Sequence, residues 1–168
     1  DYKLSRPFNI ATKGEPTGVA KDFINFILSA DGQAIVEEEG YITVNDEAEA
    51  FTTDGSEGQI AVGGSSSVSP VMEKLIEAYQ AVNPKAKIEL QTSDSTSGMT
   101  GAIDGTFAIG MASRELKDEE KAELTGTSIA LDGIAVVVNP NNTVEDLTMD
   151  QIKSIYIGET TDWADVAA

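Results

Sequence analysis

The first 44 residues carry a pattern of apolar and polar positions that predicts one strand and two helices. Residues 7–12 alternate with the period of two that is typical of a strand. Apolar residues between 19 and 28 recur as one buried stripe, which predicts an amphipathic helix. A second helix is predicted over 32–39 and ends at Gly40, because glycine favours the backbone conformation just past a helix end.

From residue 59 onward the pattern switches repeatedly between strand and helix periods. The predicted strands are 60–62, 87–92, 107–111 and 129–138, and the predicted helices begin at Pro70, pass through Met99 and Ile103, span 115–124 and span 147–156. The last strand is the most apolar stretch of the chain, so we expect it in the centre of a sheet. This alternation predicts an α/β sandwich with a mainly parallel sheet.

The stretch between these two parts, residues 45–58, has neither period. It contains five acidic side chains, no basic one, and Phe51 as its one large apolar residue. We interpret it as an exposed and mobile surface linker, with a short acidic helix over 46–51 as the alternative. Trimming it is expected to change stability little, because loop-closure entropy depends weakly on length.

Composition excludes several classes of function. The 168 residues include 11 Lys and Arg against 29 Asp and Glu, a net charge of −18, which argues against a nucleic-acid partner or an anionic membrane surface. The chain has no Cys and no His, so thiol nucleophiles, zinc sites and Ser-His-Asp chemistry are excluded. No run of 18 apolar residues predicts a membrane span, and no cofactor or metal is expected. The chain begins without Met or a signal-peptide pattern, so we expect a fragment or a processed product.

Three polar clusters follow predicted strands, at 63–70, 92–98 and 112–114. In open α/β sheets, ligands bind beyond the carboxyl ends of the strands, where helix N-termini offer free N–H groups. Two such N-termini rich in Ser and Thr, together with Arg114, predict an oxyanion site. The alternative is that these hydroxyls only cap helices. The acidic runs 37–39 and 118–120 are interpreted as solvated helix faces.

Several pieces of the chain resemble the phosphate-binding proteins of bacterial phosphate ABC transporters. Those similar to the N-terminal part of that family are 64–75, 95–98, 109–114, 132–136 and 147–163, and those similar to its C-terminal end are 6–10, 20–24 and 32–41. The family's C-terminal segment therefore comes first in this chain. The resemblance implies one lobe in circularly permuted order, taken either from a tandem protein or from a deliberate permutation.

The resemblance also implies an architecture. We expect a single lobe of a type II periplasmic-binding-protein fold, with a five-stranded mixed sheet and helices on both faces. The implied strand order is 87–92, 60–63, 107–111, 6–12 and 129–138, with 6–12 antiparallel to the others. Segments 1–44 and 59–168, joined by the acidic linker 45–58, are expected to form one domain over 1–168, without the family's second lobe.

Site residues are carried over by the same resemblance. The implied phosphate contacts are Ser66, Ser67, Ser95 and Ser113, with Thr96, Ser97 and Arg114 as neighbours. Ser113 stands where many relatives place an Asp that accepts the proton of monohydrogen phosphate. The resemblance therefore does not carry over the family's discrimination between phosphate and sulfate.

The function implied is capture of inorganic phosphate, or a similar oxyanion, outside the membrane of a bacterium for an ABC importer, without catalysis. The expected partners are the missing second lobe and the ABC permease, with no nucleic acid and no membrane insertion. The expected location is extracellular, at the cell surface or periplasmic, in a lipoprotein parent. Two alternatives remain: an interaction or scaffold module that keeps the fold without the ligand, and an engineered isolated lobe. One lobe supplies about half of the donors, so we expect millimolar or weaker binding.

Overall fold

The structure is a computed structural model, and it describes residues 4–166. It divides the chain into two compact units, where the sequence predicted one domain. The first unit, Arg6–Asp132, is called the lobe below. The second, called the terminal unit, comprises the chain through Ser5 and from Gly133 onward. Each unit is described by itself.

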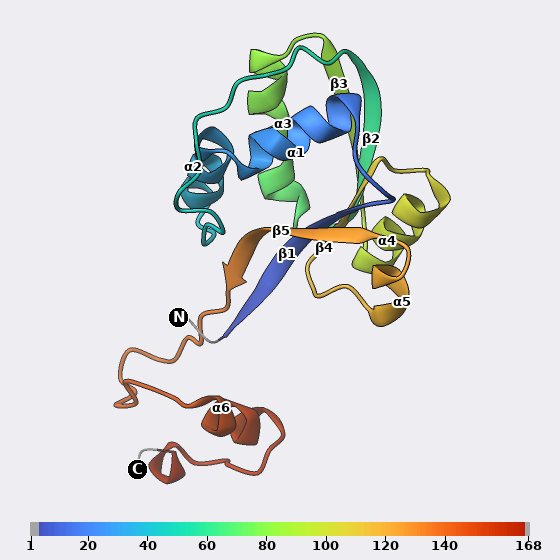
Figure 1. The fold of residues 1–168 in the computed structure, drawn as a ribbon. Helices are drawn as coiled ribbons and strands as arrows, with labels where there is room; N and C mark the ends of the chain where they lie inside the picture. Colours follow the sequence, from blue (N-terminus) through green and yellow to red (C-terminus); the bar gives the residue numbers. More distant parts are fainter. Residues whose placement is uncertain (1–3, 167–168) are drawn as a thin grey trace. The chain divides into compact units, whose positions relative to one another are not determined.

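Strands and helices alternate along the lobe, as predicted (Figure 1). The elements are β1 (Ser5–Thr12), α1 (Gly18–Leu28), α2 (Ala30–Glu38), β2 (Gly58–Ser65), α3 (Ser69–Val82), β3 (Ala86–Ser93), α4 (Ser95–Asp104), β4 (Ile109–Ala112), α5 (Asp118–Lys121) and β5 (Thr125–Gly133). Pro70 lies in the first turn of α3, where its missing N–H costs nothing, and Gly105 ends α4 in the left-handed conformation.

One five-stranded sheet organises the lobe, in the order β3-β2-β4-β1-β5. β2 runs parallel to β3 and β4, whereas β1 runs antiparallel to β4. The predicted strand order and the reversed direction of the strand at 6–12 relative to its neighbour β4 are therefore confirmed. The central position predicted for 129–138 is wrong, because β5 lies at one edge of the sheet and ends at Gly133. The apolar residues that follow are not buried in the lobe, and Val137 is 87% exposed.

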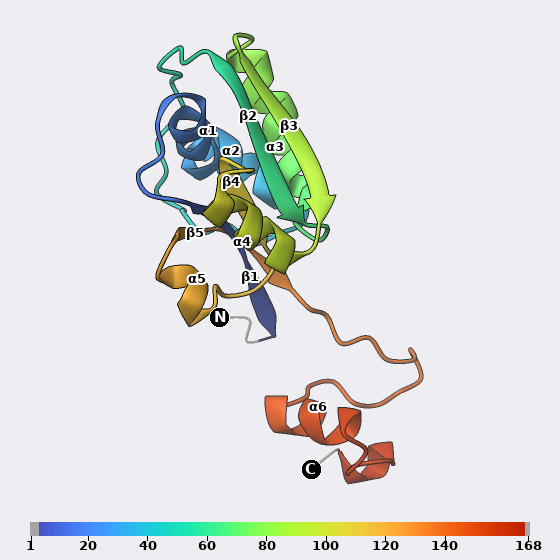
Figure 2. The same ribbon diagram turned by 90° about the vertical axis from the view of Figure 1, so that its right-hand side faces the viewer.

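Apolar side chains form two cores, because successive residues of a strand point to opposite faces of the sheet. In β1, Phe8 and Ile10 enter the larger core, which α1 and α3 complete, while Ala11 enters the smaller one with Met99 of α4. Figure 2 shows the helices in their layers around the sheet. Helices therefore cover both faces, as predicted. Each large side chain buried in this way contributes roughly 1.5–3 kcal/mol.

The acidic segment 45–57 forms neither helix nor strand, so the alternative of a short helix over 46–51 is wrong. The segment is nevertheless held against the lobe rather than free. Phe51 packs edge-on against Phe26, with ring centroids 5.1 Å apart. The buried carboxylate of Asp22 accepts hydrogen bonds from the Thr53 hydroxyl and the Asp54 backbone N–H. The prediction of an exposed, mobile linker is therefore wrong for residues 51–56, which we call the strap.

The terminal unit has a different character. Its regular elements are α6 (Met149–Tyr156) and a 3₁₀ turn over Trp163–Asp165. Thr148 caps α6 and exchanges hydrogen bonds with Gln151, but none of the side chains of α6 is buried. Val136, Val138 and Ile152 line an open hollow of about 780 Å³. In the described part of the chain, no helix is long and apolar enough to cross a bilayer.

Candidate functional site

The three predicted polar clusters meet at one edge of the sheet, where β2, β3 and β4 end. The last residues of β2 and β3, Ser65 and Ser93, are paired in register. The Ser66 N–H donates a hydrogen bond of 3.0 Å to the Ser93 carbonyl oxygen. The Ser113 N–H donates one of 3.1 Å to the Ser95 hydroxyl oxygen. Residues far apart in sequence thus form one polar edge because parallel strands bring their carboxyl ends together.

Glycines allow α4 to approach the strands closely enough for this convergence. A Cβ atom on Gly98 would lie 2.6 Å from the Met111 carbonyl oxygen and 2.7 Å from the Gly64 Cα atom. Gly64 itself has a φ of +137°, a conformation that side-chain-bearing residues rarely adopt. The N-terminus of α4 therefore lies directly against β2 and β4, and any larger residue at 98 would displace it.

Four hydroxyl groups at this edge are available to a ligand. Ser66 is exposed, whereas Ser67 and Ser113 are half-buried. Within residues 4–166, no hydrogen bond engages the hydroxyl group of any of these three serines. The half-buried Ser95 hydroxyl accepts from Ser113, which leaves its own proton free to donate. An oxyanion at this edge would meet four hydroxyl donors, and these are the serines that the resemblance identified.

Arg114 does not contribute a free cation to the site. Its two terminal nitrogens donate hydrogen bonds of 2.8 Å to the two carboxylate oxygens of Glu120. Glu120 is only 5% exposed, so its interpretation as part of a solvated helix face is wrong. The Arg114 hydrogen bonds, and one from the Lys117 N–H, hold the pKa of the Glu120 carboxyl below its usual range, against the opposing effect of burial. The pair is neutral as a whole, which leaves recognition to hydroxyl groups and backbone amides.

The N-terminus of α4 is not free either, because Asp94 caps it. The Asp94 carboxylate accepts from the Thr96 and Ser97 N–H groups and from the Ser97 hydroxyl. These bonds, that of the Ser97 hydroxyl first, hold the pKa of the Asp94 carboxyl below its usual range. The expectation of unoccupied amides at this helix is therefore wrong for Thr96 and Ser97. Asp immediately before a helix is a preferred cap, so the sequence carried this signal.

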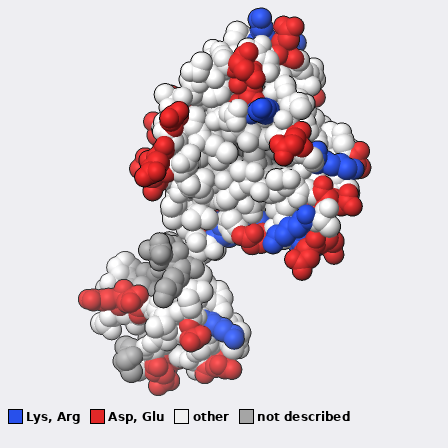
Figure 3. Space-filling view, in the orientation of Figure 1, with Lys and Arg blue, Asp and Glu red and all other residues white. Residues whose placement is uncertain are grey.

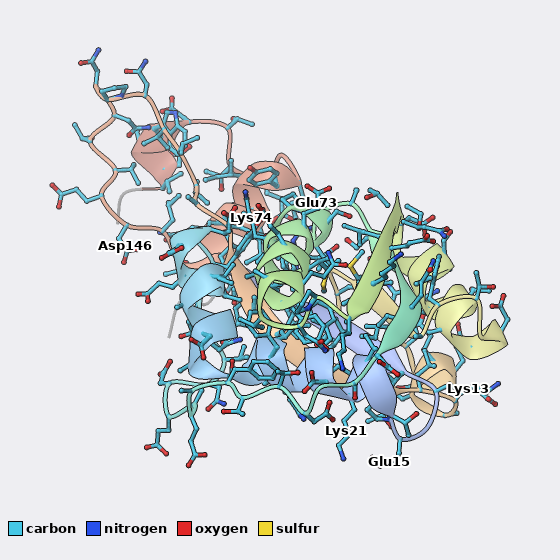
Figure 4. The ribbon with its side chains drawn as sticks, turned by 90° about the horizontal axis from the view of Figure 1, so that it is seen from above. Lys13, Glu15, Lys21, Glu73, Lys74 and Asp146 are labelled. Atoms are coloured by element: carbon cyan, nitrogen blue, oxygen red, sulfur yellow. The ribbon has the colours of Figure 1, made fainter. Side chains whose placement is uncertain are left out.

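The remaining cations near the sheet lie toward its other end. β1 runs antiparallel to β4, so the residues after β1 lie at the edge where β4 begins. Lys13 and Lys21 follow β1 there (Figure 4), and the Lys13 ammonium donates to the carbonyl oxygen of Ile103 near the end of α4. Figure 3 shows acidic and basic side chains spread over the surface in small groups. No group of three or more potential metal ligands occurs among the described residues.

Comparison with known proteins identifies the family. Residues 49–168 match the PBP superfamily domain. This chain belongs to that family. Its members here are binding proteins rather than enzymes, and the fold described above is part of theirs.

The relatives carry one description. The chain is 55% identical over 168 residues to the phosphate-binding protein PstS 2 of Streptococcus agalactiae, covering 99% of this chain and 57% of that protein. A crystal structure of the phosphate-binding protein of a phosphate ABC transporter from Streptococcus pneumoniae is 41% identical, with a TM-score of 0.90, over 98% of this chain and 64% of that one. A putative phosphate ABC transporter substrate-binding protein from Clostridium perfringens, solved with bound phosphate, is 44% identical over 64% of this chain and 45% of that one, with a TM-score of 0.54. The chain therefore spans little more than half the length of its curated streptococcal relatives.

Proposed function

We propose that this chain contains the phosphate-binding lobe of an ABC-transporter solute-binding protein, which captures inorganic phosphate outside the membrane. The observation that carries the proposal is the convergence of the Ser66, Ser67, Ser95 and Ser113 hydroxyls at the carboxyl edge of the sheet. Neutral donors bind an oxyanion without a matching positive charge, and distant surface charges are screened beyond about 8–10 Å. The relatives' descriptions, and the phosphate in the Clostridium structure, support phosphate as that anion.

The proposal includes a second lobe contributed by the rest of a longer protein. The streptococcal relatives extend well beyond the matched region. The terminal unit exposes large apolar side chains, among them Tyr156 at 80% and Trp163 at 45%. Exposed apolar groups of this size mark a surface that another part of a protein covers. We expect the second lobe to cover the terminal unit and to supply the other half of the donors, and the permease to bind the two-lobed protein.

The order of the segments is the third part of the proposal, in which the lobe is circularly permuted relative to other family members. The streptococcal relatives match 97–99% of this chain, whereas the Clostridium structure and a Staphylococcus saprophyticus protein match 64–66%. The family match itself starts at residue 49. This difference supports a different position for the first 48 residues in the latter group. The full-length streptococcal matches favour a natural order over an engineered one.

Phosphate titration with serine variants tests the binding site. Replacing Ser67 or Ser113 by Ala should weaken phosphate binding about tenfold each, about 1.4 kcal/mol, because each removes one donor to an anion. Both variants should fold normally, since neither hydroxyl makes a hydrogen bond within residues 4–166. Thr100→Ala is the matched control, an exposed hydroxyl lost from α4 away from its N-terminus. Amide chemical-shift titration measures binding in the millimolar range.

The same titration separates phosphate binding from the alternatives. An interaction module or an isolated lobe without a ligand predicts no phosphate-dependent shift at the three loops, and equal behaviour of all three variants. Repeating the titration by calorimetry on the S. agalactiae relative, which is longer, tests the contribution of the second lobe. Its affinity should exceed that of this chain by several powers of ten, because closure around the anion removes competing water.

A further inference from the structure

The Asp94 carboxylate occupies donors that an anion would use. Its Oδ1 accepts from the backbone N–H of Thr96 at 2.8 Å and of Ser97 at 3.0 Å. Its Oδ2 accepts from the Ser97 hydroxyl at 2.7 Å. An oxyanion at a helix N-terminus binds through this kind of donor set, where the helix dipole favours negative charge. A negative group of the protein thus lies within the edge to which phosphate is assigned above.

The charge of Asp94 is not cancelled by a neighbour. In the described part of the chain, no Lys or Arg nitrogen lies within 4.0 Å of its carboxylate oxygens. The nearest guanidinium along the loops, that of Arg114, is held by both oxygens of Glu120 and reaches toward α4 only through a contact of 3.5 Å with the Thr96 hydroxyl. The three charges therefore leave one net negative charge at the edge.

The position of Asp94 beside the ligand hydroxyls follows from the same contacts. The next residue, Ser95, has the hydroxyl that the Ser113 N–H contacts, and the preceding residue, Ser93, has the carbonyl that the Ser66 N–H contacts. Asp94 is thus flanked in sequence by residues that join the other two loops. It is exposed, so its charge acts on a ligand through a mixture of protein and water.

We propose that Asp94 is an internal competitor for the anion, holding the Thr96 and Ser97 amides and repelling phosphate from the serine hydroxyls. The inference rests on the proposed function, since it concerns the same site. It assigns to Asp94 a negative effect on affinity, opposite in sign to that of the four serines.

Two substitutions separate the two effects of the carboxylate. Asp94→Asn removes the charge but keeps an oxygen that caps α4. Asp94→Gly removes charge and acceptor together, and glycine is itself a tolerated cap that costs a few tenths of a kcal/mol. Asp104→Asn is the matched control, because it removes one charge from the same helix at its other end, where the carboxylate accepts from the Thr106 N–H.

The experiment is an amide chemical-shift titration of this chain and the three variants with sodium phosphate, at constant ionic strength maintained with sodium chloride. We expect the dissociation constant for phosphate to fall about threefold to tenfold in Asp94→Asn and at least about tenfold in Asp94→Gly. In Asp104→Asn it should stay within about twofold of the starting chain, since screening removes remote charges. A thermal melt of each variant establishes that it is folded.

Two results would overturn the inference, and they are distinguishable. If phosphate shifts the Ser66, Ser67, Ser95 and Ser113 amides but both Asp94 variants bind equally or more weakly, Asp94 is no competitor while the proposed function stands. Weaker binding by Asp94→Asn would instead mean that the carboxylate accepts a proton from the ligand. If phosphate shifts none of these amides in any of the four proteins, the proposed function fails and the inference fails with it.

Discussion

At the scale of single residues, the site depends on how its charged groups are paired. Arg114 and Glu120 form a two-pronged ion pair with side-chain exposures of 30% and 7%. Removing one partner from such a pair leaves the other without compensation in a poorly hydrated position. The pair also closes the loop between β4 and α5, because Glu120 accepts from the Lys117 N–H and Arg114 accepts from Asn9 of β1 through its carbonyl oxygen. Its function is therefore to position this loop.

Replacing Glu120 by Gln should lower the free energy of unfolding by about 2 kcal/mol at pH 7, because the neutral amide loses the charge-assisted bonds to Arg114. The pKa of Glu120 is lowered in the folded state, so its contribution is complete above the unfolded value near 4.3. As the pH falls through the folded pKa, this contribution is lost. Denaturant unfolding at pH 7 and pH 3 measures the effect. Equal differences at both pH values would contradict the assignment.

At the scale of elements, the strap of residues 51–56 substitutes tertiary contacts for secondary structure. Asp22 of α1 is buried and accepts from the strap and from the Tyr79 hydroxyl of α3 at 2.8 Å. Burial is the main cause that raises the pKa of Tyr79 to about 12, so its hydroxyl keeps the proton that it donates. Asn83 connects Tyr79 to the carbonyl oxygen of Ser56. The strap thus joins the two helices that cover the larger core.

Replacing Phe51 by Ala should lower the free energy of unfolding by about 2 kcal/mol, below the 3–5 kcal/mol of a fully buried ring because Phe51 is half-buried. The loss arises from its contacts with the rings of Phe26 and Tyr79. Glu47→Ala, in the exposed part of the same segment, is the control and should change stability by less than about 0.5 kcal/mol. Equal stability of the two variants would restore the interpretation of the whole segment as a free linker.

At the scale of the whole molecule, the two units differ in how completely they bury their apolar residues. Both core clusters draw all their buried members from the lobe, between Phe8 and Ala130. In the terminal unit, by contrast, α6 buries no side chain. The lobe therefore has the core of an independent folding unit, and the terminal unit has the surface of an incomplete one.

Deleting residues 139–168 should leave the thermal midpoint of the lobe within about 3 °C of the starting value, because no core contact is lost. Binding of a hydrophobic dye such as ANS should fall, since the deletion removes exposed apolar side chains including Tyr156 and Trp163. Circular dichroism melts and dye fluorescence measure the two effects. A midpoint lower by more than about 8 °C, the size of a full 1 kcal/mol or more in a small domain, would show that the lobe depends on the deleted part.

The sequence by itself determined the elements whose signals are local. Periodicity located the helices and strands to within a few residues, and the position of the hydroxyl-rich loops after strands identified the edge at which they meet. The strand order and the reversal of β1 came from the resemblance, since alternation alone leaves the order of strands open. The end of β5 was misplaced because the apolar run through Val138 has one character in sequence, although only its first part pairs with the sheet.

Only the tertiary structure decided which polar groups are free. Whether Arg114 serves a ligand or Glu120, and whether the α4 amides are open or capped by Asp94, depends on distances of a few ångströms after the chain has folded. The attachment of the strap through Asp22 likewise joins residues about 30 positions apart. Hydrogen bonds and ion pairs are short-range and competitive, so each donor is committed by the nearest acceptor in space, and a linear sequence does not record that proximity.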